Sequence, residues 1–183
     1  MQAENLKSLI LNLVKIPHET EWIEFKRNNQ NPDEIGEYIS ALANSAMLHQ
    51  QPMAYLVWGV DDQNHAIVGT DFKPKLQKVG NQELENYLSC LLSPKIDFRI
   101  HELEIEDKRM VVFALPAASS LPISFKGIEY IRVGSYKKKL KDHPEKEREL
   151  WQLFSNHTFE KAVAIENVTA NEVLKLIDYP GYF

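Results

Sequence analysis

Three stretches of this chain place charged or amide side chains beside apolar residues, a setting suited to catalysis or to contact with phosphate. They are residues 19–29 (ETEWIEFKRNN), 39–45 (ISALANS) and 58–62 (WGVDD). Together they supply several carboxylates, the ammonium group of Lys26 and the amide of Asn44, which packing alone would not require. The sequence therefore indicates where a site lies more clearly than what the site does.

A second candidate site is a run of positive charge within an acidic chain. The net charge of −5 argues against a nucleic-acid partner, because binding to the phosphate backbone usually needs clustered lysine and arginine. Between residues 132 and 148, however, seven basic residues stand against three acidic ones. A solvated loop and helix face is the simplest interpretation of such a run, and contact with phosphate is the alternative.

The residues of this run that suit phosphate contact are Arg132, Gly134, Ser135, Lys137, Lys138 and Lys139. Arg132 and the hydroxyl of Ser135 would donate hydrogen bonds to a phosphate, while Gly134 would let the backbone approach it. The three lysines would add a diffuse attractive field. An ordinary strand end followed by a glycine turn is the alternative interpretation, and base-specific recognition is not visible.

Hydrophobic spacing predicts the elements that position these residues. Residues 6–13 have the spacing of a short amphipathic helix. Residues 22–26 alternate as a strand, which would point Glu24 and Lys26 away from the core. A cap residue, a proline and an acid at residues 31–34 then start a second helix, the one that carries Asn44.

The next apolar run, residues 53–60, is typical of a central strand buried on both faces, and Asp61 and Asp62 begin the turn after it. Strands and helices follow without a regular β-α-β period, which indicates an α+β domain with a mixed β-sheet flanked by helices. We expect this domain at residues 1–143 and a C-terminal helical extension at 144–183. The later elements expected are a strand at 66–69, a helix at 82–92, hairpins pairing 98–105 with 110–115 and 123–125 with 129–133, and helices at 144–154 and 169–177.

Composition excludes several classes of protein. No apolar run approaches the roughly 20 residues that span a bilayer, and the N-terminus lacks the features of a secretory signal. We therefore expect a cytoplasmic protein with no membrane partner. The single cysteine, Cys90, excludes an internal disulfide and a cysteine-rich zinc site, and its leucine-rich setting predicts a buried thiol.

Four motifs occur in a defined order, namely ETEWIEFK, ISALANS, YLVWGVDD followed by HAIVGT, and EYIRVGS. In this combination the chain resembles the Schlafen-type AlbA-like domain, which is assigned to DNA binding in many bacterial transcriptional regulators. The resemblance runs from about residue 19 to about residue 143. It implies an N-terminal module followed by a winged-helix region beyond this chain, which the apolar end at Tyr179, Tyr182 and Phe183 would precede.

The resemblance also implies a chemistry. In the animal Schlafen relatives that cut RNA, a carboxylate cluster uses a divalent metal, and the equivalent positions here are Glu19, Glu24 and Asp61 or Asp62. Mg²⁺ or Mn²⁺ prefers such oxygen ligands and activates water at a phosphate, while Lys26 would neutralise the developing charge. Because Glu19 and Glu24 are five residues apart, they converge only if Glu19 lies in the loop before the strand.

Simpler interpretations exist for these residues: a surface ion pair with Lys26 or Arg27 for Glu24 and Asp62, and helix-end hydrogen bonding for Asn44. Together with these residues, the resemblance implies a domain of a bacterial transcriptional regulator that binds DNA or RNA, with Lys26, Asn44 and the 132–139 segment in contact. A Schlafen-type endoribonuclease that uses Mg or Mn is the alternative, and a ligand-sensing or dimerisation module is a third. The choice between DNA and RNA, sequence specificity and a homodimer are left open.

Overall fold

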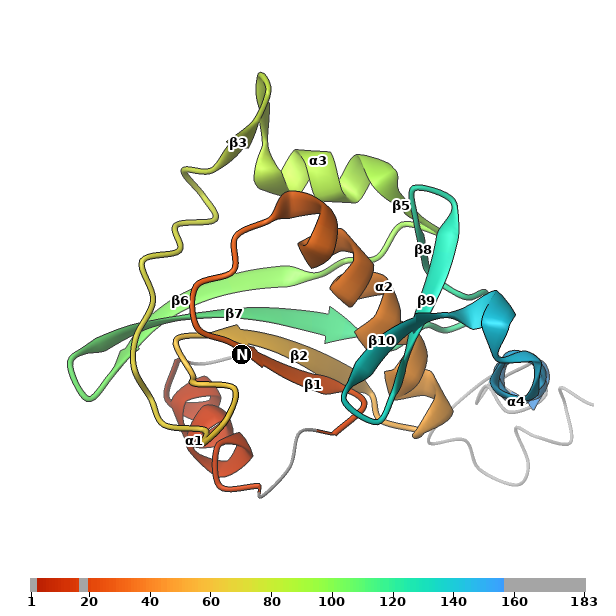
Figure 1. Cartoon of the computed structure of the whole chain (residues 1–183), viewed down its shortest axis with the longest axis horizontal. Coiled ribbons are helices and arrows are strands. Elements are labelled where there is room, and N and C mark those ends of the chain that lie inside the picture. Colours follow the sequence, from red (N-terminus) through yellow and green to blue (C-terminus); the bar gives the residue numbers. More distant parts are fainter. Residues whose placement is uncertain (1–2, 17–19, 157–183) are drawn as a thin grey trace, which may run out of the picture.

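The computed structural model describes residues 3–16 and 20–156. At its centre, strand β2 (Met53–Trp58) lies between β1 (Ile23–Lys26) and β7 (Lys108–Pro116), and β6 (Arg99–Ile105) follows β7 at the far edge. The β1–β2 pair is parallel, whereas the β2–β7 and β7–β6 pairs are antiparallel. This first sheet is therefore mixed, and the predicted central position of the 53–60 run is confirmed (Figure 1).

Helices cover both faces of the first sheet. Helix α1 (Ala3–Leu13) packs Leu6 and Ile10 against Phe25 and Val57 on one face. Helix α2 (Pro32–Leu48) lies across the opposite face, against the apolar side chains of β2 and β7 (Figure 1). The alternation of side chains along each strand therefore fills two separate cores.

The start of α2 is confirmed in detail. The side chain of Asn31 accepts hydrogen bonds from the backbone N–H groups of Asp33 and Glu34, at 3.0 and 3.3 Å. Pro32 occupies the first helical position, where its missing N–H costs no hydrogen bond. Asn31 therefore caps the helix as its position in the sequence predicts.

A second sheet lies on the other side of α2. Its strands follow the order β10 (Tyr136–Lys139), β9 (Ile128–Val133), β8 (Ser124–Phe125) and β5 (Leu92–Ser93), and all of its neighbouring pairs are antiparallel. Helix α2 is thus enclosed between the two sheets (Figure 1), and all of its residues from 39 to 48 are buried. A Cβ atom at Gly36 would lie 2.2 Å from the ring of Phe125, so glycine is required where α2 crosses β8.

The remaining elements complete the outer surface. A short hairpin of β3 (Lys78–Val79) and β4 (Gln82–Glu83) leads into α3 (Leu84–Leu91). A 3₁₀ turn, η1 (Leu140–Asp142), leads into α4 (Pro144–Asn156), whose Leu150 and Phe154 are buried in the core around α2. The α+β class, with a mixed sheet and a helix after residue 143, is confirmed, while the division into a domain and an extension stays a prediction.

Some expectations were wrong. Residues 66–69 form a single bridge, Val60 to Ile67, instead of a strand, and strand β10 was not predicted. Cys90 is exposed, because α3 buries Leu84 and Leu88 on its other side. The helix expected at 169–177 and the aromatic residues at the end of the chain lie outside the described residues. Within the described ranges, no helix has the length and apolar character needed to cross a membrane.

Candidate nucleic-acid interface

Glu24 lies at the junction of β1, α2 and β9. Its neighbours Ile23 and Phe25 face α1, so the alternation of the strand turns Glu24 toward α2. The expectation that Glu24 projects away from the core was wrong, since only 4% of the residue is exposed. Glu24 does pair with Lys26, the partner in the alternative interpretation, with Nζ 2.5 Å from Oε1, but the carboxylate is buried and not on the surface. Its second oxygen forms an ion pair with the guanidinium group of Arg132.

Arg132 is fully buried, although the sequence suggested that it contacts phosphate. The ion pair with Glu24 compensates its charge, which is what makes a buried guanidinium tolerable. Its backbone N–H donates to Oγ of Ser45, at 2.9 Å, and so joins β9 to α2. Arg132 therefore acts inside the domain, and we exclude it from the candidate interface.

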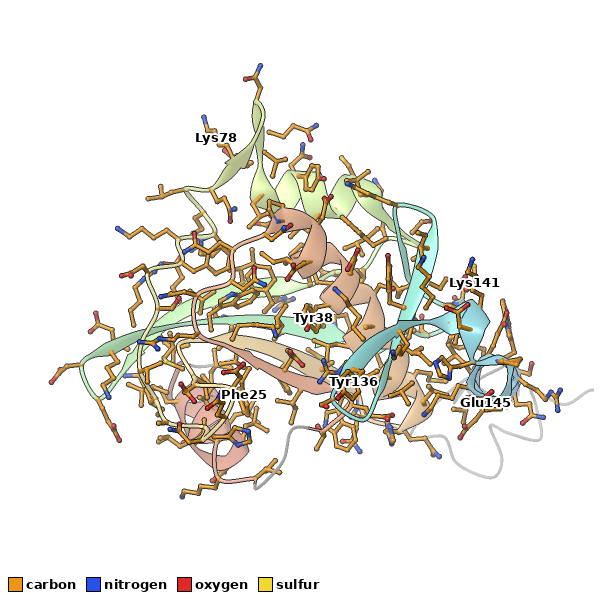
Figure 2. All side chains as sticks on the ribbon, in the orientation of Figure 1. Phe25, Tyr38, Lys78, Tyr136, Lys141 and Glu145 are labelled. Atoms are coloured by element: carbon orange, nitrogen blue, oxygen red, sulfur yellow. The ribbon has the colours of Figure 1, made fainter. Side chains whose placement is uncertain are left out.

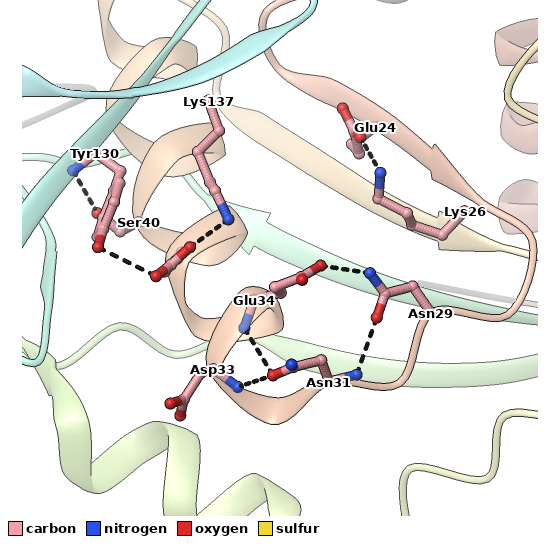
Figure 3. A network of polar contacts seen from close by, with 10 residues as sticks. Glu24, Lys26, Asn29, Asn31, Asp33, Glu34, Ser40, Tyr130 and Lys137 are labelled. Carbon is pink, nitrogen blue, oxygen red and sulfur yellow. Dashed lines mark hydrogen bonds and ion pairs between the residues drawn. The ribbon is translucent and has the colours of Figure 1, made fainter.

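Three cations surround the ring of Tyr38, a residue that the sequence did not single out. Lys26 Nζ and Lys137 Nζ lie 4.6 and 4.4 Å from the ring centroid, and Cζ of Arg132 lies 5.7 Å from it. Lys137 also forms an ion pair with Glu37 on α2 (Figure 3). The ring faces and the two carboxylates hold these cations in place.

The surroundings of Lys26 and Tyr38 keep both side chains protonated. Burial alone would lower the pKa of Lys26, but attraction and hydrogen bonding to the Glu24 carboxylate outweigh it, so the pKa is raised. Burial also raises the pKa of the Tyr38 hydroxyl, and the charge of Glu24 adds to that effect. At neutral pH Lys26 is therefore a cation and Tyr38 a neutral phenol.

Asn44 is fully buried as well, and its side-chain amide joins α2 to the second sheet. It donates to the carbonyl oxygens of Ile123 and Tyr130, at 2.8 and 2.9 Å, and accepts from the N–H of Ile123 at 2.7 Å. Ser40 acts in parallel, donating to the carbonyl of Ile123 and accepting from the N–H of Tyr130. The polar residues of ISALANS satisfy backbone groups inside the domain, so the predicted contact between Asn44 and nucleic acid has no support.

The turn between β9 and β10 is hydrogen-bonded to a carboxylate of the same domain. Gly134 has a φ of +59°, which suits glycine, and its N–H donates to Oε1 of Glu21 at 2.7 Å. Glu21 also contacts His49 and Lys146, at 2.6 and 3.4 Å. Burial would raise the pKa of Glu21, but these partners outweigh it and lower the pKa. The Gly134 N–H thus serves a carboxylate in the place where we expected a phosphate, while Ser135 is exposed beside it.

The predicted residues that do reach the surface lie on β10. Lys138 and Lys139 are exposed, and Lys141 follows them in η1 with its side chain also exposed. Tyr136, at the start of β10, is exposed too, and Lys138 Nζ lies 5.5 Å from its ring centroid. Figure 2 shows Tyr136 near the β9–β10 turn and Lys141 beyond the opposite end of β10. These residues make β10 and the start of η1 a lysine-rich edge of the second sheet, with Glu129 of β9 beside Lys139 and Lys141.

The carboxylates of the described residues do not gather into a metal centre. Glu24 is engaged by two cations, and Asp61 accepts hydrogen bonds from the N–H groups of Gln63 and Asn64 in its own turn. Asp62 is exposed, and Glu19 lies outside the described residues. Residues 3–16 and 20–156 contain no group of three histidine, cysteine or acidic side chains that could hold a metal ion. The predicted Mg or Mn site therefore gains no support from this geometry.

The fold and the surface define an α+β domain in which a buried helix joins two sheets and a lysine-rich strand forms one exposed edge. Residues 19–141 match the family model described as Schlafen, AlbA_2. The chain belongs to this family, and the resemblance inferred from its four motifs is confirmed. No curated protein sequence matches the chain.

Ten solved chains resemble this one in structure. The DIP2311 protein from Corynebacterium diphtheriae is 15% identical, with a TM-score of 0.49 over 74% of this chain and 26% of that one. The N-terminal domain of a RecG-related protein from Nitrosomonas europaea is 21% identical, with a TM-score of 0.45 over 75% of this chain and 93% of that one. The chain thus spans about a quarter of the DIP2311 protein, and likeness at this level carries no argument about function.

Proposed function

We propose that this domain binds nucleic acid through the basic hairpin, by which we mean β9, β10 and Lys141, as a module of a bacterial transcriptional regulator. The observation that carries the proposal is the segregation of charge. Residues 136–141 contain four lysines and no acid, in a chain whose net charge is −5. Membership of the Schlafen AlbA_2 family supports a role connected with nucleic acid.

The lysines of the basic hairpin divide into two groups. Lys137 points inward and is paired with Glu37, so its charge is largely used inside the domain. Lys138, Lys139 and Lys141 are exposed, and none of them forms an ion pair with a carboxylate of the described part of the chain. Exposed, uncompensated lysines on a strand are the groups that displace counterions from a phosphate backbone. The second group is therefore the part of the surface to test.

The test is a triple substitution of Lys138, Lys139 and Lys141 to glutamate, measured by fluorescence anisotropy with labelled DNA and RNA at several salt concentrations. Each lost phosphate contact should lower the salt slope by about 0.9 on duplex DNA or about 0.7 on a single strand, so the slope should fall by up to roughly 2 to 3. Unchanged affinity and slope would overturn the proposal.

A matched control shows whether an effect on binding depends on where the lysines lie or only on the net charge of the protein. Lys73, Lys75 and Lys78 are exposed, and Figure 2 shows Lys78 at the far side of the molecule from Tyr136 and Lys141. Converting these three lysines to glutamate changes the net charge equally but should leave the salt slope near that of the wild type. Parallel incubations with Mg²⁺, Mn²⁺ or EDTA, read on a gel, show whether binding is accompanied by cleavage.

A further inference from the structure

The most exposed aromatic side chain of the described residues lies on the basic hairpin. Tyr136 is 68% exposed, compared with 42% for Trp151, the other exposed aromatic residue within 3–16 and 20–156. We infer that the Tyr136 ring is a stacking platform for an unpaired base, so that the hairpin prefers single-stranded nucleic acid. This inference rests on the proposed function and specifies its ligand.

The position of Tyr136 suits this role. Tyr136 and Lys138 are two residues apart, so their side chains lie on the same side of β10. They are about 7 Å apart along the strand, given a rise of about 3.3 Å per residue. Nζ of Lys138 lies 5.5 Å from the ring centroid. Tyr136 is 68% exposed with this ammonium group beside it, so much of the ring remains accessible to a base. An aromatic face beside lysines provides the two groups that single-strand binding uses, one for the base and one for the backbone.

The packing of the hairpin argues against insertion into a duplex. A two-stranded ribbon can enter the major groove, where arginine, lysine, asparagine or glutamine side chains on its exposed side read base edges. Strand β10 offers lysine but no arginine, asparagine or glutamine for such contacts, and Arg132 of β9 is buried. Moreover, Lys137 and Tyr130 are tied to Glu37, so this side of the hairpin is fastened to α2 (Figure 3). The accessible chemistry is backbone attraction plus stacking, which tolerates any sequence.

The test compares four labelled ligands of equal length: single-stranded DNA, single-stranded RNA, a DNA duplex and a single strand of abasic sites. The wild type should bind the two base-containing single strands more tightly than the duplex or the abasic strand. Tyr136→Ala should weaken binding to those single strands by about 5- to 150-fold, the equivalent of 1 to 3 kcal/mol for one stacked base. It should leave the duplex, the abasic strand and the salt slope unchanged.

Two further variants complete the design. Tyr136→Phe keeps the ring and should retain single-strand affinity, whereas Trp151→Ala removes an exposed aromatic side chain from α4 and should change nothing. Equal single-strand affinity of wild type and Tyr136→Ala, or an equal loss on all four ligands, overturns the stacking role while leaving nucleic-acid binding intact. Absence of salt-dependent binding by the wild type overturns the proposed function and this inference together.

Discussion

Replacing Glu24 by glutamine should destabilise the domain substantially, because the carboxylate compensates a fully buried guanidinium. The Glu24 side chain is 5% exposed and that of Arg132 is not exposed at all. Removing one partner from a buried ion pair typically costs about 3 to 5 kcal/mol, since the remaining charge stays in a medium of low polarity. Glutamine can still accept one hydrogen bond, and Lys26 can turn toward water, so we expect the lower end, about 3 kcal/mol.

Urea unfolding, followed by tryptophan fluorescence, measures this loss. The midpoint should fall at unchanged m value, and the melting temperature should drop by about 6 to 12 °C for a domain of this size. Asp97→Asn is the matched control, because it makes the same change of charge in a pair whose side chains are 88% and 67% exposed. Such surface pairs contribute about 0 to 1 kcal/mol.

A second substitution tests the cause of the loss. If the cost arises from loss of the Glu24–Arg132 ion pair, Arg132→Met in the Glu24→Gln background should restore part of the stability, because both members of the buried pair are then replaced by uncharged side chains. An unfolding free energy of Glu24→Gln within about 1 kcal/mol of the wild type would refute this reasoning. If the Glu24→Gln variant kept its nucleic-acid binding but lost metal-dependent cleavage of RNA, the nuclease hypothesis would gain the support that the geometry does not give it.

Two other outcomes follow from contacts of α2 and Glu21. Gly36→Ala should lower the melting temperature although alanine favours a helix, because its Cβ would meet the Phe125 ring at 2.2 Å. Overpacking of this kind costs about 1 to 3 kcal/mol. Phe125→Leu in the same background should recover part of the lost stability. Because the pKa of Glu21 is lowered in the folded state, its partners stabilise the fold at pH values above its ordinary pKa of 4.5. This contribution disappears as the pH falls through the pKa that Glu21 has in the folded state. Urea midpoints of wild type and Glu21→Gln should therefore differ at pH 7 and converge at acidic pH.

The elements that depend on local patterns were predictable from the sequence. The apolar run of β2 and the cap of α2 at Asn31 can each be recognised from a few adjacent residues. Strand β10 has no such signal, because its exposed lysines give no apolar alternation. It forms by backbone pairing with β9 at the edge of the second sheet, and lysine-rich edges of this kind are how sheets resist pairing with other chains.

Burial of the charged residues could not be predicted in the same way. The alternation of β1 fixes the side on which Glu24 lies but not what covers that side. The second sheet supplies the cover, and it places Arg132, more than a hundred positions away in sequence, against Glu24. For the same reason Asn44 looked like a surface amide, although its partners are the backbone groups of Ile123 and Tyr130.

These placements separate the residues that identify the family from those that we expect to bind. The glutamate of EFK, the asparagine of ANS and the arginine of IRVGS belong to one interior assembly that fastens β1, α2 and the second sheet together. Their motifs therefore specify how the domain is built, and a domain can keep them while its exposed edge changes. Because function depends on the groups that reach the surface, the ligand of this chain should follow Tyr136, Lys138, Lys139 and Lys141. A relative with the same interior but a neutral or acidic edge strand should share the fold and lack this binding.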